Sequence, residues 1–245
     1  MNRLLEIEDV SVAYGGLKAL SNVTFAMQGP GVFGLIGPNG AGKSTCINVL
    51  TGFQPPAQGG IALDGVSLVG KSPVEFRHLG ISRTFQAGRL FASLSVEDNV
   101  TAAGVGLGLS RRAAETETER LLKWTGISHM AERRSGDLPY TDQRRLSIAR
   151  ALVGNPNFLL LDEPAAGMSA TEADELGRLI KSIAEQNVRV LLIEHNVPLV
   201  LSVCEHIAVL DGGRLIASGD PHAIRTNAIV REAYLGSKHE PEVTS

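Results

Sequence analysis

Short, unbroken apolar runs mark the predicted core of the chain. Residues 32–36, 158–161 and 188–193 are almost entirely hydrophobic, as is typical of parallel strands that helices cover on both faces. Residues 4–12 alternate instead between apolar and polar positions, which indicates a strand with one solvent-exposed face. Residues 20–27 predict a further strand. Together these patterns predict an α/β fold.

A different pattern covers about residues 87–155, where charged residues and helical periodicity replace the strand-like runs. Residues 113–124 place charged side chains around Leu121, Leu122 and Trp124, as in an amphipathic helix. The glycine-rich stretch 104–108 lacks both the G-x-G-x-x-G spacing and a preceding strand, so we interpret it as a loop between helices. The sequence therefore predicts a helical lobe inserted into the α/β core.

The C-terminal part of the chain predicts a hairpin followed by a helix. Two apolar stretches within residues 207–217 flank the turn Asp211-Gly212-Gly213. Asp220 and Pro221 then form a typical helix start, with an N-cap acceptor and a proline in the first turn. We expect one domain over residues 1–245, which ends in a C-terminal helix and tail at about 218–245.

Composition and charge limit the possible functions. A chain of 245 residues with 43% hydrophobic content can bury a substantial core, and a net charge of −3 argues against nucleic acid as the main partner. Cys46 and Cys204 lack partners at metal-ligand spacing and are expected to be reduced core residues of a cytoplasmic protein. No apolar run reaches the roughly 18 residues that a membrane-spanning helix needs. We therefore expect a chain that can bind a membrane protein without itself crossing the membrane.

The strongest candidate chemistry lies in residues 37–45, here called the phosphate loop. Gly37, Gly42, Lys43 and Ser44 satisfy the pattern G-x-x-x-x-G-K-[ST] between an apolar strand and a helix. Glycines let the backbone N–H groups point at a phosphate, while Lys43 reaches the β- and γ-phosphates and the Ser44 hydroxyl can bind Mg2+. The loop predicts a nucleoside triphosphate site, with the residues Gly37, Pro38, Asn39, Gly40, Ala41, Gly42, Lys43, Ser44 and Thr45.

Further polar residues follow other predicted strands. Asp162 and Glu163 come directly after the buried run 158–161, at the edge of an α/β sheet where ligands bind. Asp162 is placed to hold Mg2+ through water, and Glu163 to polarise an attacking water. Gln86 ends the apolar strand predicted at 81–86, and His195 follows the one at 188–193, although a single glutamine or histidine carries little weight alone.

Tyr14 lies upstream of the phosphate loop, near the end of the strand predicted at 4–12. An aromatic ring at this place can stack on an adenine. It can equally be an ordinary aromatic residue at a strand end, and the residue alone favours that second interpretation.

Taken together, these residues resemble the ATP-binding cassette (ABC) family over nearly the whole chain. The resemblance implies a P-loop NTPase (RecA-like) core, an N-terminal antiparallel β-subdomain, an inserted α-helical subdomain and a pair of cassettes that enclose ATP head to tail. It makes Tyr14 the adenine-stacking residue and Gln86 the glutamine that touches Mg2+ and the membrane partner. Glu163 becomes the catalytic base, and His195 faces the γ-phosphate. The implied catalytic set is Glu163, His195 and Gln86, and the implied metal ligands are Ser44, Gln86 and Asp162.

Within this family the chain is most similar to the ATPase subunits of branched-chain amino-acid importers. The strings that carry this similarity are LTGF (50–53), RTFQ (83–86), RLF (89–91), QRRL (143–146), DEPAAGM (162–168) and EAYLG (232–236). The implied function is ATP hydrolysis that powers import of branched-chain or other hydrophobic amino acids, at the inner face of the cell membrane. The implied partners are membrane-spanning permease subunits, a second cassette and, indirectly, a solute-binding protein.

Three other functions are alternatives to amino-acid import. The cassette of a lipopolysaccharide-type exporter is similar over much of the same length. A non-transport ABC ATPase is less favoured, because the chain has one phosphate loop and no sustained heptads. A small-molecule phosphate-loop kinase leaves His195 and the helical lobe unexplained.

The chain departs from the family pattern at the signature segment, residues 138–142. The family sequence is L-S-G-G-Q, whereas this chain has Leu138, Pro139, Tyr140, Thr141 and Asp142. Pro139 supplies neither a hydroxyl nor an N–H, and Thr141 adds a β-branched side chain where close backbone approach is needed. Ser169 stands where an aspartate is usual in the family. We therefore expect a heterodimer, in which a different cassette supplies an intact signature to this chain's own ATP.

Overall fold

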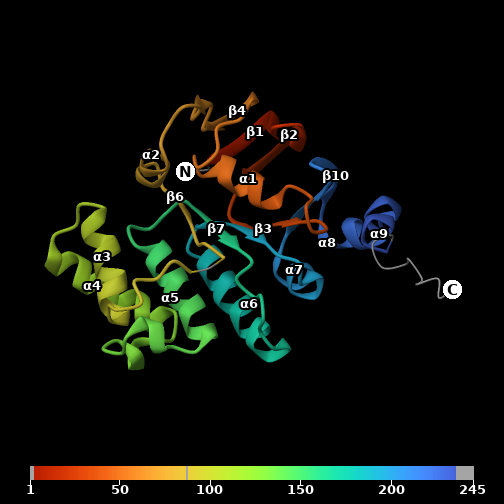
Figure 1. Cartoon of the computed structure of the whole chain (residues 1–245). Coiled ribbons are helices and arrows are strands. Elements are labelled where there is room, and N and C mark those ends of the chain that lie inside the picture. Colours follow the sequence, from red (N-terminus) through yellow and green to blue (C-terminus); the bar gives the residue numbers. More distant parts are fainter. Residues whose placement is uncertain (1–2, 87, 236–245) are drawn as a thin grey trace.

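Two sheets of different kinds form the framework of the molecule (Figure 1), for which a computed structural model describes residues 3–86 and 88–235. The smaller sheet is antiparallel and has the order β2-β1-β4-β5. Its strands are β1 (Leu4–Tyr14), β2 (Leu17–Gln28), β4 (Gln58–Leu63) and β5 (Val66–Ser67). Apolar residues of β1 alternate with exposed ones, which confirms the strands predicted at 4–12 and 20–27.

The larger sheet has the order β10-β9-β3-β8-β7-β6, in which only β10 runs antiparallel to its neighbour. The strands are β3 (Gly31–Ile36), β6 (Ile81–Arg83), β7 (Phe158–Asp162), β8 (Arg189–Ile193), β9 (His206–Asp211) and β10 (Arg214–Gly219). Because β3, β6, β7 and β8 are parallel, their carboxyl ends meet at one edge of the sheet.

Both faces of this sheet are covered, which explains why its central strands have unbroken apolar sequences. Leu160 and Leu191 face a core that α1 (Lys43–Leu50) shares with the small sheet. Leu159 and Val190, one residue away, face the opposite core. That second core packs against α5 (Tyr140–Leu152), α6 (Ala170–Ala184) and α7 (Val197–Val203), which lie on the far side of the sheet from β1 and β2 (Figure 1).

The segment between β6 and β7 is helical, as predicted, and forms the yellow and green part of Figure 1. It contains α3 (Val96–Gly106), α4 (Arg111–Trp124), the short 3-10 helices η1 (Ser128–Met130) and η2 (Ser135–Asp137), and α5. Leu121 and Leu122 are buried on one face of α4, which confirms its amphipathic pattern. The expected loop at 104–108 is wrong in its first part, because α3 continues to Gly106.

The physical reason for this difference is close packing between α3 and α4. A Cβ atom added at Gly104 would lie 2.8 Å from the Cβ of Ala114 on α4. Gly104 is therefore a helix residue that lets a neighbouring helix approach, rather than a loop residue. Helix α2 (Pro73–His78) was not predicted, although Ser72 and Glu75 form a capping box at its start.

The C-terminal elements follow the prediction. Strands β9 and β10 form the hairpin, and the Asp220 carboxylate accepts a hydrogen bond of 2.8 Å from the Ala223 N–H to cap α8 (Pro221–Thr226). Helix α9 (Ala228–Leu235) follows. The remaining tail, Gly236 of the EAYLG string and Ala87 at the expected start of the helical lobe lie outside the described residues. The division of residues 1–245 into subdomains at about 87–155 and 218–245 stays a prediction.

None of the helices in residues 3–86 and 88–235 has the length and apolar character to span a membrane.

Candidate functional site

The phosphate loop connects β3 to α1 at the carboxyl edge of the large sheet. Gly42 caps α1 with a φ of 101°, in the left-handed region. A Cβ atom at this position would lie 2.5 Å from the Ala19 carbonyl oxygen in β2, so only glycine fits without a shift of the chain. The N-terminus of α1 thus lies at the phosphate loop, and its free N–H groups can bind an anion.

Lys43 lies over the carbonyl groups of its own loop. Its Nζ donates hydrogen bonds to the Gly37 oxygen at 2.8 Å and the Pro38 oxygen at 3.0 Å, and the residue is 6% exposed. Burial lowers the pKa of Lys43, while the nearby carboxylates of Glu163 and Asp162 oppose that shift. The lysine is therefore held beside both carboxylates before any ligand binds.

The other residues of the phosphate loop differ in exposure. Asn39, Gly40 and Ser44 are exposed, and Ala41 is buried beneath the loop. Pro38 and Thr45 are half-buried. Ser44 is thus an exposed residue at the start of α1, and its hydroxyl oxygen is of the kind that a hard cation such as Mg2+ binds.

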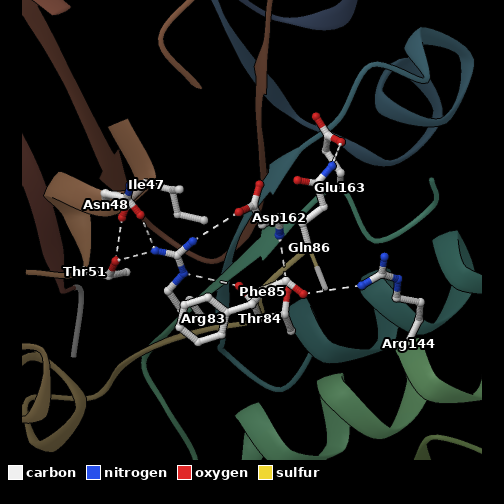
Figure 2. Close-up of polar contacts among 10 residues, drawn as sticks. All are labelled: Ile47, Asn48, Thr51, Arg83, Thr84, Phe85, Gln86, Arg144, Asp162 and Glu163. Carbon is white, nitrogen blue, oxygen red and sulfur yellow. Dashed lines mark hydrogen bonds and ion pairs between the residues drawn. The ribbon is translucent and has the colours of Figure 1, made fainter. Parts of the chain in front are cut away.

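The structure brings Gln86 and Glu163 together, although they are far apart in the sequence. The Gln86 Nε2 donates a hydrogen bond of 2.8 Å to Glu163 Oε2 (Figure 2). Glu163 follows β7, and its N–H donates to the Ile193 oxygen of β8 at 2.9 Å. Its φ of 46° is unusual for a residue other than glycine. Because the amide nitrogen of Gln86 serves Glu163, its amide oxygen is the atom suited to a metal.

The strand that leads to Gln86 is shorter than predicted. Strand β6 ends at Arg83, after which the Thr84 N–H donates one more bond, of 2.9 Å, to the Leu160 oxygen. The chain then leaves the sheet, so Gln86 lies on a connecting segment that is exposed to solvent. The expected strand over 81–86 is therefore wrong for its second half.

Asp162 ends β7 and is paired with an arginine that the sequence analysis did not single out. The Arg83 NH2 lies 3.1 Å from Asp162 Oδ2, and the two side chains are only 8% and 11% exposed. Burial raises the pKa of Asp162, Arg83 opposes this, and Glu163 adds to it. Asp162 Oδ1 has no recorded hydrogen bond within the described residues, which leaves one carboxylate oxygen for Mg2+ or its water.

His195 follows β8, and its ring is exposed at the same sheet edge. The residue before it, Glu194, is fully buried, and its two carboxylate oxygens contact two separate segments. Oε1 accepts a bond of 2.7 Å from the Ala165 N–H, and Oε2 accepts bonds of 3.2 and 3.4 Å from the His195 and Asn196 N–H groups. Burial raises the pKa of this carboxyl. Glu194 therefore joins the turn after Glu163 to the backbone of His195.

Sequence reasoning missed Glu194 as a functional candidate. The available signal was a glutamate directly after the apolar run 190–193 and directly before a candidate histidine. Arg83 gave a weaker signal, because its partner Asp162 lies in a distant part of the chain and only the strand order brings the two together.

Tyr14 lies at the end of β1, with about half of the residue exposed. Its hydroxyl donates a bond of 3.2 Å to the Gln54 side-chain oxygen. Tyr14 is thus partly accessible to a ligand, but its role toward a base stays a prediction.

The signature segment forms the start of α5. Pro139 is the N-cap residue and supplies no side-chain hydrogen bond to the described helix. Tyr140 is the first helical residue, and its hydroxyl accepts a hydrogen bond from Arg144, whose guanidinium carbon lies 4.4 Å from the ring centre. Leu138 is buried, while Thr141 and Asp142 are half-buried. Within the described residues, no recorded hydrogen bond joins this segment to residues 37–45.

Ser169 also caps a helix. Its hydroxyl accepts a bond from the Glu172 N–H and donates one of 2.7 Å to Glu172 Oε2, so the two residues form a capping box at the start of α6. The Ser169 hydroxyl is thus already hydrogen-bonded to Glu172 of its own chain.

The donor set fits Mg2+ better than a transition metal. The described residues contain no cluster of three or more His, Cys, Asp or Glu side chains that could hold a metal. The predicted ligands Ser44, Gln86 and Asp162 instead supply a hydroxyl, an amide oxygen and one carboxylate. Mg2+ is bound by such sparse oxygen sets together with water and phosphate oxygens.

Comparisons with known proteins bear on the whole chain. A family model for ABC transporters matches residues 20–166, and a second model, for the branched-chain amino acid ATP-binding cassette transporter, matches residues 214–240. The chain is 39% identical to the high-affinity branched-chain amino acid transport ATP-binding protein BraF of Pseudomonas aeruginosa, over 95% of this chain and 98% of that protein. It is 32% identical to the lipopolysaccharide export system ATP-binding protein LptB of Haemophilus influenzae, over 96% and 98%.

Solved structures give the same result for the fold. A nucleotide-free ATP-binding cassette from an ABC transporter superposes with a TM-score of 0.86 at 29% identity, over 96% of this chain and 99% of that one. An ATP-binding cassette in its ADP conformation gives the same TM-score at 30% identity. These matches confirm the predicted P-loop NTPase core with its N-terminal β-subdomain and inserted helical subdomain. The chain belongs to the ABC transporter family, as one of its ATP-binding cassettes.

Proposed function

We propose that this cassette powers the import of branched-chain or other hydrophobic amino acids. As a family member it is an ATPase whose hydrolysis of ATP is coupled to transport. The observation that carries the choice of substrate is the match of residues 214–240 to the branched-chain amino acid model, a segment outside the general ABC match at 20–166. The lower identity to LptB, 32% against 39% for BraF, supports the exporter alternative less.

We assign the following roles to the site residues. Lys43 and the N–H groups of the phosphate loop bind the phosphates of ATP, and Tyr14 stacks on the adenine. Glu163 accepts a proton from the attacking water and orients it, and His195 faces the γ-phosphate. Ser44, Asp162 and the Gln86 amide oxygen hold Mg2+, which when bound neutralises charge on the phosphates. The Gln86–Glu163 hydrogen bond of 2.8 Å supports a catalytic base whose position depends on Gln86.

A second, different cassette is proposed as the partner. Pro139 has no hydroxyl to offer a partner's γ-phosphate, and the β-branched side chain of Thr141 hinders the close approach of its backbone N–H. Ser169, whose hydroxyl is bonded to Glu172, adds no further group. A heterodimer lets this chain's own phosphate loop, Glu163 and His195 face an intact signature.

The proposed permease-binding surface surrounds a groove of about 440 Å³ between the sheet and the helical lobe. Phe53, Val74 and Phe91 are its exposed apolar residues. Among the described residues its lining includes arginines and no carboxylate, which favours a permease helix with an apolar face and an acidic residue. The cassette is thereby held at the inner face of the membrane, and the solute-binding protein acts only through the permease.

Uptake tests the proposed substrate. Cells that lack this chain should lose uptake of labelled leucine, isoleucine and valine, and the parent chain should restore it. A normal uptake of all three amino acids without the chain would contradict the proposal.

Docking is tested separately with Phe91→Ser. This change should abolish co-purification with the permease and leave ATP binding intact. The matched control is Ile229→Ser on α9, because Phe91 is 56% exposed and Ile229 57%. The control should co-purify normally, and equal loss in both variants would argue against docking at the groove.

A further inference from the structure

Arg83 lies between the groove and the carboxylate of Asp162. It is the last residue of β6, and it lines the groove together with Phe53 and Phe85. Its NH2 makes the 3.1 Å ion pair with Asp162 on the other side. A single buried guanidinium thus contacts both the proposed permease-binding surface and a proposed metal ligand.

Several acceptors fix the guanidinium in this position (Figure 2). The Arg83 NH1 donates to Asn48 Oδ1 at 2.8 Å and to Thr51 Oγ1 at 3.2 Å, and Nε donates to the Thr84 oxygen at 3.3 Å. Asn48 belongs to α1, which begins at the phosphate loop, and Thr51 follows it. The planar group therefore has a set orientation, which a flexible ammonium group would not have.

Aromatic rings complete the link to the groove. The guanidinium carbon lies 4.4 Å from the Phe85 ring centre and 5.3 Å from that of Phe53. The two rings contact each other edge to face, 5.6 Å apart. Because Phe53 is half exposed on the groove, a helix bound there would press on the rings that hold Arg83.

We propose that Arg83 is a positioning residue that orients the Asp162 carboxylate and transmits occupancy of the groove to it. The ion pair occupies Oδ2 and leaves Oδ1 without a recorded hydrogen bond in the described residues, so Oδ1 is the oxygen that would bind the metal or its water. A shift of the guanidinium would break this ion pair at a buried carboxylate, so the position of Asp162 is coupled to that of Arg83. This route differs from the contact between Gln86 and Glu163, because it ends on the metal ligand rather than on the base. The role of the groove in this proposal rests on the permease docking proposed above.

The first test uses the isolated full-length chain and varies Mg2+. Binding of a fluorescent ATP analogue is measured in EDTA and over a series of Mg2+ concentrations. Arg83→Lys keeps the charge but loses most hydrogen bonds, so we expect the half-saturating Mg2+ concentration to rise about tenfold. Binding in EDTA should stay within about twofold of the parent, because the phosphate loop is unchanged. An unchanged Mg2+ dependence in the folded variant overturns the positioning role.

The second test changes the groove and leaves Arg83 in place. Phe53→Leu removes one ring contact with the guanidinium at a half-exposed position, so the variant stays folded even where Arg83→Lys does not. We expect its half-saturating Mg2+ concentration to rise about two- to fivefold. Val74→Ser is the matched control, since Val74 lines the same groove and has no recorded contact with Arg83 in the described residues.

Equal Mg2+ dependence in Phe53→Leu and Val74→Ser overturns the transmission from the groove.

The proposed function and the proposed role of Arg83 fail in different ways. A parent chain that binds no ATP contradicts the proposed function and this inference together. A parent that binds ATP normally, beside an Arg83→Lys variant with parental Mg2+ dependence, contradicts the inference alone.

Discussion

The proposed nucleotide site is built very differently from the signature segment, which we propose faces a partner cassette. The first joins residues from four parallel strands, and buried contacts such as Glu194 with Ala165 fix their positions. The second is the start of one helix, where Pro139 provides no cap and Tyr140 packs on Arg144 of the same helix. The difference teaches that the two segments have separate structural requirements, which is the basis of the proposed asymmetry: one segment can change while the other is kept.

The largest expected effect comes from removing the base on the complete side. Glu163→Gln should retain ATP binding but lower turnover in the assembled transporter about a hundredfold or more, the scale of general-base catalysis. Steady-state ATPase rates and ATP titrations measure the two effects. Lys43→Ala is the contrasting variant, because it should weaken ATP binding itself. Turnover of Glu163→Gln at close to the parent rate would show that the complete half does not depend on Glu163.

An intermediate effect is expected from repairing the degenerate side. Pro139→Ser with Thr141→Gly restores a hydroxyl and allows close backbone approach, each of which can supply about 1.5–3 kcal/mol toward a charged phosphate. The repaired chain alone should hydrolyse ATP at least about tenfold faster than the parent alone. ATPase rates of both chains, with and without the partner cassette, provide the measurement. A parent chain that alone already reaches the rate of the full transporter would refute the asymmetry.

The smallest effect concerns the pH dependence of folding. Burial raises the pKa of Glu194, so the folded chain holds this proton more tightly than the unfolded chain. The resulting stability is fully present below the ordinary value of 4.5 and is lost as the pH rises through the folded pKa. Between the ordinary and the folded pKa of Glu194, the free energy of unfolding of the parent should fall by up to about 1.4 kcal/mol per pH unit because of this group. Glu194→Gln should abolish that part of the fall.

Urea unfolding at a series of pH values tests this prediction. Ile193→Val is the control, because it changes a buried neighbour without changing charge and should lower stability equally at every pH. A pH slope that is the same in Glu194→Gln and the parent would show that folding does not raise the pKa of Glu194.

Local features were predictable from the sequence, whereas contacts between distant segments were not. The phosphate loop and the cap at Asp220 each depend on a few adjacent residues. The pairing of Arg83 with Asp162 depends on the order of strands in the sheet, which no local pattern encodes. Gly104 was misread for a related reason, since its place in a helix follows from the approach of Ala114. Roles such as adenine stacking by Tyr14 stay predictions, because they depend on a ligand.

The backbone of Glu163, with its φ of 46°, has a consequence for engineering. A side chain other than glycine in this conformation costs on the order of 1–3 kcal/mol. Glycine or asparagine at this position would relieve that cost and remove the carboxylate. If Glu163 is the proposed base, selection for heat resistance alone would favour chains without it, and active thermostable variants would gain their stability at other positions.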